Sequence, residues 1–243
     1  MPDHLEHATR SSRRSNVYRR ILDLLISGAL AIITLPIVLI AAVGSAISLR
    51  AWPFFSQERV GRHGETFKFL KIRTLPLTVP TYTDKYQLGG HDIPRFCQAL
   101  RRLHLDELPQ LYLVVMGRMA LVGPRPEMRY LHDQMPAEFS QQRTMVRPGC
   151  TGLWQVSSSC TGLISAAPEY DCFYLTHRSL RLDVWILFRT ALKMTGLATS
   201  VALTDVPRWT LPSEGVTAAR VIDLRDSAVE DSETSGIAVS AGR

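Results

Sequence analysis

Cysteine is scarce in this sequence, and its spacing argues against two common roles. The chain has four cysteines, Cys97, Cys150, Cys160 and Cys172, which form no CxxC pair and no Cys/His spacing typical of a zinc site. A disulfide framework is also disfavoured, because such frameworks belong to short, cysteine-dense secreted chains. We therefore expect reduced thiols in a protein that faces the cytosol, packed as small apolar side chains.

Acidic residues are sparse in the body of the chain, and no internal repeat is present. The net charge is +6, and from Val201 onward seven acidic residues stand against four arginines, so residues 1–200 carry +9. A basic body suits phosphate-bearing partners such as anionic lipid, nucleotides or nucleic acid. The hypothesis of a membrane-tethered nucleic-acid binder is supported by this charge alone, because the sequence contains no recognisable nucleic-acid-binding module. Residues 199–243 are polar and acidic, which predicts a disordered tail.

One long apolar run follows a basic start. From Leu24 to Leu49 the sequence contains no charged residue, and about 20 apolar residues are enough to span a bilayer. A cleavable signal peptide fits poorly, because the run is too long and no small-residue cleavage site precedes a polar domain. We predict a basic segment at residues 1–20 and a membrane helix at residues 21–50.

The charges beside this run indicate how it lies in the membrane. Arg19 and Arg20 precede the run, Arg50 and Arg59 follow it, and positive charge marks the cytoplasmic side. Pro36, near the middle, removes a backbone hydrogen bond and kinks a helix. A kinked, re-entrant helix that enters and leaves by one leaflet satisfies both observations. The alternative is a tilted single-pass helix that tolerates the proline.

Beyond the run, patterning indicates several short elements. Residues 52–75 predict a short hairpin, because glycines mark a turn between partly alternating segments. Helical patterning covers residues 95–103 and 108–116, with Gly117 as the stop. Residues 168–196 predict one or two amphipathic helices whose apolar face could contact lipid.

The stretch LHLDELPQL places two carboxylates, Asp106 and Glu107, among leucines. Proline is well tolerated in the first turn of a helix, so Pro109 predicts that Asp106 lies near the N-cap. Free N–H groups and the helix dipole would keep its carboxyl group ionised there. Such a pocket suits phosphate: an aspartate there can attack phosphorus, and its neighbour can hold Mg²⁺. Taken alone, the stretch favours an ordinary N-cap with a neighbouring first-turn acid and nothing more.

Five motifs in order make the chain resemble the bacterial sugar transferase family, the monotopic phosphoglycosyl transferases, over residues 17–198. They are QERVGRHGETFKFLKIRTL, LHLDELPQL, MALVGPRPE, VRPGCTGLWQV and YDCFYLTHRSLRLDVWIL. The resemblance implies a small, helix-rich α/β catalytic domain at residues 51–198, carried on a re-entrant, Pro-kinked membrane helix with amphipathic interfacial helices. It implies a monotopic enzyme of the bacterial inner membrane, with its catalytic domain in the cytosol.

The implied reaction transfers a sugar 1-phosphate from a UDP-sugar to polyprenyl (undecaprenyl) phosphate, releases UMP and uses Mg²⁺. It is the first membrane step of exopolysaccharide, capsule, O-antigen or glycoprotein glycan assembly. By resemblance, Asp106 is the nucleophile that forms a covalent phosphosugar intermediate, and Glu107 is the Mg²⁺ ligand. The substrate-binding residues implied in the same way are Arg101, Arg125, Lys71, Arg73, Asp171 and Arg147.

Some of these residues have plainer interpretations, and the partners follow from the reaction. Arg125 could anchor its loop by a salt bridge, and Lys71 and Arg73 could contact lipid headgroups. The expected partners are the UDP-sugar, polyprenyl phosphate and membrane lipid, with a homodimer or downstream glycosyltransferases left open and no nucleic acid.

Three departures from the family pattern bear on the donor. Leu35 stands where a serine usually precedes Pro36, Arg118 replaces an acidic residue, and Ser157–Cys160 replaces the usual Asn-Gly-Arg. They leave the identity of the sugar and the pathway open. They also leave a non-catalytic scaffold as the competing hypothesis, although nothing in scaffolding requires the charged set around Asp106.

Overall fold

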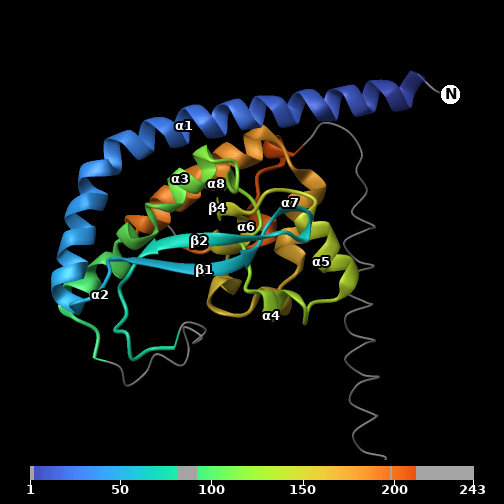
Figure 1. Ribbon diagram of the computed structural model, residues 1–243. Helices are drawn as coiled ribbons and strands as arrows, with labels where there is room; N and C mark the ends of the chain where they lie inside the picture. The colour runs from blue at the N-terminus through green and yellow to red at the C-terminus, as the bar shows by residue number, and fades with distance from the viewer. Residues whose placement is uncertain (1–2, 81–91, 198, 212–243) are drawn as a thin grey trace, which may run out of the picture. The chain divides into compact units, whose positions relative to one another are not determined.

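The computed structural model describes residues 3–80, 92–197 and 199–211 (Figure 1). The chain forms two compact units, one of Met1–Arg59 with Thr66–Leu121 and one of Val60–Glu65 with Val122–Arg243. Helices predominate over two two-stranded sheets, which confirms a helix-rich α/β fold. The units do not follow the expected ranges, because the apolar helix shares a unit with the first part of the domain expected at residues 51–198.

Helix α1 runs from Asp3 to Leu49 with Pro36 inside it, and its ribbon changes direction part-way along (Figure 1). Its segment Val17–Leu49 is long and apolar enough to cross a membrane. Ile32, Ile40 and Ile47 are 75%, 70% and 73% exposed, whereas the buried positions are mainly small: Ser27, Ala31, Ala41, Ala42 and Ser45. A soluble helix buries its large apolar side chains. In α1 the large apolar side chains are exposed and mainly small ones are buried, an arrangement that suits contact with lipid.

Hydrogen bonds attach α1 to the first unit at several points along its length. Arg20 Nη1 donates to the carbonyl of Val114 at 2.7 Å, and the Tyr112 hydroxyl donates to the carbonyl of Ala31 at 3.1 Å. Further along, the Ser45 hydroxyl donates to the carbonyl of the residue that follows strand β2. The folded elements of this unit therefore accompany the helix from near its basic start to near its end.

The expected hairpin is present. Strands β1 (Phe54–Val60) and β2 (Thr66–Ile72) pair, and the 3-10 turn η1 (Arg62–Gly64) joins them. Gly64 has φ +78, a left-handed conformation that glycine adopts without strain. The turn glycines in the sequence were therefore sufficient to predict this hairpin.

The two helices expected next also form. They are α2 (Arg95–Arg102) and α3 (Gln110–Val115), and the chain turns at Gly117 with φ +79. A small core joins these elements to α1; its members are Val38, Ala41, Ile72 and Leu100, with Leu105 and Leu108 packed against them. This core fixes the segment between α2 and α3 against the membrane helix.

The second unit is built mainly from helices and 3-10 turns. Strand β3 (Ala120–Val122), at the boundary of the units, pairs with β4 (Gly149–Thr151). The other elements are α4 (Arg129–His132), α5 (Ala137–Thr144), α6 (Leu153–Val156), η4 (Ser158–Thr161), η5 (Ile164–Ala166), α7 (Glu169–His177) and α8 (Leu180–Met194). Pro136 separates α4 from α5, and the Ser179 hydroxyl caps α8 by accepting from the Leu182 amide at 3.0 Å.

The beginning of the expected tail is folded. Residues 199–211 contain the 3-10 turns η6 (Leu203–Asp205) and η7 (Arg208–Thr210), and Val201 and Thr210 are 1% and 0% exposed. A parallel bridge between Ser157 and Val201 holds this segment. The prediction of a disordered tail from residue 199 is therefore wrong for residues 199–211, because a few apolar side chains are enough to pack this segment. The remainder, residues 212–243, lies outside the described residues.

The four cysteines are free thiols, and Cys97 and Cys172 are buried. Burial, with the nearby carboxylate of Asp171, raises the pKa of the Cys172 thiol to about 12. A buried thiol of this kind is unreactive, in agreement with the expectation of small apolar packing residues.

Candidate active site

Asp106 and Glu107 lie in the 3-10 turn η3 (Leu105–Glu107), and the expected N-cap position for Asp106 is wrong. Helix α3 begins at Gln110 with Pro109 as its N-cap, and no side chain caps it. His104, with φ 55 and ψ 21, takes a left-handed conformation between α2 and η3. This bend lets the chain complete a separate turn before the proline, so the two acids precede the helix instead of starting it.

Glu107 is paired with a lysine from strand β2. Lys71 Nζ lies 2.8 Å from Glu107 Oε1, and the two side chains are 22% and 27% exposed. The same ammonium lies 5.4 Å from the centroid of the Phe69 ring. Lys71 is thus joined to the acidic pair by an ion pair that is partly exposed to solvent, and its substrate-binding role stays a prediction.

Asp106 is almost fully buried, at 6% exposure. Burial raises the pKa of its carboxyl; the cation of Lys71 opposes this shift, Glu107 adds to it, and Arg101 opposes it more weakly. Arg101 Nη1 also donates to Thr74 Oγ1 at 3.3 Å. The charges that act on Asp106 differ from the expected ones. No helix N-terminus stabilises the carboxylate, and the cations of Lys71 and Arg101 favour its charged form instead.

Arg73 faces a different set of groups. Its Nε donates to the carbonyl of Trp52 at 3.0 Å, and its guanidinium carbon lies 5.6 Å from the Phe55 ring centroid. Trp52 is 72% exposed and follows the apolar helix, as an aromatic residue of the membrane interface does. Arg73 is thus bonded to the segment that follows the apolar helix, and its substrate-binding role and the lipid-headgroup alternative both stay predictions.

The other expected residues belong to the second unit, where Asp171 forms a buried ion pair. Arg143 Nε lies 2.8 Å from Asp171 Oδ2, with side chains that are 4% and 2% exposed, and Arg143 Nη2 donates to the carbonyl of Arg125 at 2.6 Å. Burial raises the pKa of Asp171, and Arg143 opposes that shift. A carboxylate enclosed in this way is a partner of Arg143 and not an open substrate ligand.

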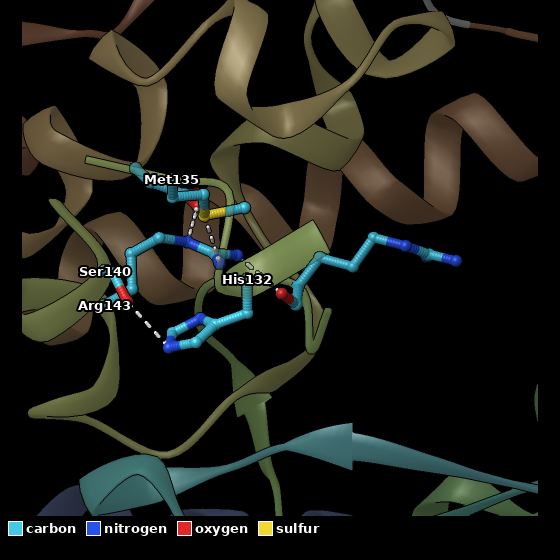
Figure 2. A network of polar contacts seen from close by, with 6 residues as sticks. His132, Met135, Ser140 and Arg143 are labelled. Atoms are coloured by element: carbon cyan, nitrogen blue, oxygen red, sulfur yellow. Dashed lines mark hydrogen bonds and ion pairs between the residues drawn. The ribbon is translucent and has the colours of Figure 1, made fainter. Parts of the chain in front are cut away.

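Sequence reasoning missed Arg143 entirely. Its partner Asp171 is 28 residues away in the chain, and no local pattern marks such a pair. In Figure 2 its side chain approaches Met135, while Ser140 lies against the His132 ring. The pairing of α5 with α7 depends on tertiary packing alone.

Arg125 and Arg147 lie where two loop segments meet closely. Arg125, Arg143 and His132 line one pocket of this unit. A Cβ added at Gly123 would meet the backbone carbonyl of Arg147, and one added at Gly149 would overlap the Gly123 backbone. The glycines of the two arginine motifs are therefore required for this approach.

Within the described residues, no cluster of three or more His, Cys, Asp or Glu side chains forms a protein-only metal site. The adjacent carboxylates of Asp106 and Glu107 nevertheless fit Mg²⁺. That ion is commonly held in nucleotide sites by one or two carboxylates together with phosphate oxygens and water.

Comparisons with known proteins place this site in context. Residues 14–196 match the family model described as bacterial sugar transferase. The chain is 34% identical over 193 residues to the UDP-galactose-lipid carrier transferase of Erwinia amylovora, covering 72% of this chain and 40% of that protein. It is 36% identical over 178 residues to the UDP-glucose:undecaprenyl-phosphate glucose-1-phosphate transferase of Xanthomonas campestris pv. campestris, covering 68% and 36%.

The extent of these matches differs between relatives. The chain spans about two fifths of the length of the two proteins just named. A shorter relative, an uncharacterized sugar transferase of Bacillus subtilis, is 32% identical over 186 residues, covering 73% of this chain and 87% of that protein. The similarity thus concerns the region that holds the acidic pair and both arginine motifs.

Proposed function

The chain belongs to the bacterial sugar transferase family, and we propose that it transfers a sugar 1-phosphate from a UDP-sugar to undecaprenyl phosphate. The observation that carries the proposal is the buried Asp106 carboxylate with Lys71 and Glu107 beside it. Two relatives are named for undecaprenyl-phosphate sugar-phosphate transfer. Phosphoryl transfer needs positioning and charge neutralisation, and this group of residues can supply both.

We propose that Asp106 is the nucleophile of a two-step reaction. A carboxylate oxygen of Asp106 attacks the phosphorus that carries the sugar; the bond from that phosphorus to the bridging oxygen breaks, and UMP leaves with the oxygen and its electron pair. A phosphate oxygen of undecaprenyl phosphate then attacks the same phosphorus, and Asp106 returns as a carboxylate. Desolvation favours this role, because a poorly hydrated carboxylate with a raised pKa is more basic and more nucleophilic.

Four residues would prepare the protein for this reaction. The positive charges of Lys71 and Arg101 oppose the rise that burial causes in the pKa of Asp106, and so favour its ionised form. Glu107 would hold Mg²⁺, which when bound neutralises the charge of the diphosphate. Arg125 would contact a donor phosphate, as expected from the resemblance.

We propose that α1 enters and leaves the membrane from the cytosolic side. Its bonds at Arg20, Ala31 and Ser45 all join it to the first unit. A straight span would require those folded elements to cross the bilayer with it, at a high cost for their polar backbone groups. Pro36 inside the helix and basic residues on both flanks support the same topology. The lipid acceptor would then reach Asp106 in the plane of the membrane.

The test is UMP release by the purified protein with Mg²⁺ and a panel of UDP-sugars. With one of these donors, about one equivalent of UMP should appear before undecaprenyl phosphate is added, with a sugar-phosphate adduct on Asp106 detected by mass spectrometry. Undecaprenyl phosphate should then restore continuous turnover. Asp106→Asn should lower turnover by more than about 1000-fold, because it removes the nucleophile.

The matched control is Asp133→Asn, which alters an exposed carboxylate paired with Arg129. It should retain wild-type turnover. An Asp106→Asn protein that turns over as fast as wild type would overturn the proposed function and favour the non-catalytic scaffold.

Topology has a separate test in bacterial cells. Single cysteines at Val17 and Trp52, which are 56% and 72% exposed, would be labelled in a background with Cys150→Ser and Cys160→Ser. Both positions should resist a membrane-impermeant thiol reagent until the cells are opened, and the background without added cysteines measures labelling of the two buried thiols. Labelling of either position in intact cells would establish a true span.

A further inference from the structure

We propose that Arg143 and Asp171 are positioning residues, which hold the Arg125 segment in the conformation that binds the UDP-sugar donor. The inference rests on the proposed function, because it assumes that Arg125 contacts the donor. It changes the role of Asp171, which the family resemblance implies as a substrate-binding residue.

Arg143 connects three parts of the second unit through one guanidinium. Its Nε donates to Asp171 of α7 at 2.8 Å, its Nη2 to the carbonyl of Arg125 at 2.6 Å, and its Nη1 contacts the Met135 sulfur at 3.6 Å. Both charged partners are almost fully buried. A planar guanidinium can serve such divergent acceptors at once, whereas a lysine ammonium cannot match the geometry.

Backbone hydrogen bonds hold the segment on either side of Arg125. The Gly149 amide donates to the carbonyl of Pro124, and the Val60 amide to the carbonyl of Glu127, each at 2.9 Å. Between these points, the bond to the carbonyl of Arg125 is donated by a side chain. The conformation at Arg125 itself therefore depends on Arg143, and Asp171 fixes the orientation of that guanidinium.

Helix α5 also holds the segment that follows Arg125. Ser140 and Arg143 are three residues apart and lie on one face of α5; Ser140 Oγ is 2.7 Å from Nε2 of His132. His132 ends α4 (Arg129–His132). Figure 2 shows Ser140 against the His132 ring and Arg143 beside Met135 in one view. The helix thus acts as a rigid support, and Arg143 is the part of it that reaches Arg125.

The test separates positioning from stability by replacing the whole ion pair. In Arg143→Met/Asp171→Leu, no buried charge is left alone, and such apolar replacements commonly preserve stability. We expect the double variant to keep the wild-type unfolding midpoint, yet to release UMP about 100-fold more slowly with a raised KM for the donor, the scale expected for small misplacements of a binding group. Wild-type kinetics in the folded double variant would overturn the inference.

Arg143→Lys provides an independent check that retains the charge. It should keep the pair with Asp171 but lose the bond to the Arg125 carbonyl, and so reproduce the raised donor KM. Full activity in this variant would contradict the proposal. The control is Arg129→Lys in the exposed pair with Asp133, which should leave the kinetics unchanged.

A mutant cycle with Arg125 decides whether Arg143 acts through it. If the pair only positions Arg125, then adding Arg143→Met/Asp171→Leu to Arg125→Ala should cause no further loss of UMP release. Losses that multiply would overturn the inference and leave the proposed function intact, provided Asp106→Asn remains inactive. An active Asp106→Asn protein would instead overturn the proposed function.

Discussion

The protein contains two ion pairs of equal length in different surroundings. Lys71–Glu107 in the first unit and Arg143–Asp171 in the second both measure 2.8 Å, but their side chains are 22% and 27% exposed in one and 4% and 2% exposed in the other. The first pair remains accessible to a ligand that could exchange for either partner. The second is enclosed by protein and joins three segments of chain.

The comparison shows that distance alone does not assign a role to an ion pair. Removing one partner of a buried pair leaves an uncompensated charge in a low dielectric. Near the surface, water takes the place of the missing partner, and little stability is lost. We therefore expect the buried pair to control folding and positioning, and the open pair to control the reactivity of Asp106.

The largest expected effect is on stability. Arg143→Met should lower the free energy of unfolding by about 3–5 kcal/mol, whereas Lys71→Met should lower it by at most about 1 kcal/mol. Urea unfolding of both variants in the same detergent measures the difference. Equal losses would show that the two environments do not differ energetically.

A smaller expected effect separates the two pairs by activity. Lys71→Met should lower UMP release by about 100-fold at an unchanged unfolding midpoint, because a preorganised cation is lost beside the reacting carboxylate. The matched control is Lys68→Met, three residues earlier on β2 and exposed. Identical activity in the Lys71 and Lys68 variants would remove Lys71 from the site.

The smallest expected effect is a shift in pH dependence. Because burial raises the pKa of Asp106 above its ordinary 3.8, activity should fall, as the pH is lowered, through a value higher than 3.8. Lys71 lowers this pKa, so Lys71→Met should move the acid limb to still higher pH, and Lys68→Met should not move it. The rate of UMP release, measured as a function of pH, locates the acid limb of the wild-type protein and of each variant. A Lys71→Met limb at or below that of wild type would contradict this sign.

Local chemistry explains which parts of the fold were predictable. The turn glycines predicted the hairpin at residues 52–75. The helical spacing of apolar residues, with Gly117 as a stop, predicted α2 and α3. The position of Asp106 was predicted incorrectly, because a left-handed residue at His104 inserts η3 before Pro109. Residues 199–211 were misjudged as a disordered tail, because Val201 and Thr210 find buried places on distant elements.

The sequence by itself determined the family, the long apolar helix and the identity of the acidic pair, since each depends on residue type and order along the chain. The tertiary structure decided which charges meet. The packing of β2 against η3 brought Lys71 to Glu107. The packing of α5 with α7 enclosed Arg143 with Asp171 across 28 residues of chain. Burial, which no linear pattern records, distinguishes the enclosed Arg143–Asp171 pair from the more open Lys71–Glu107 pair.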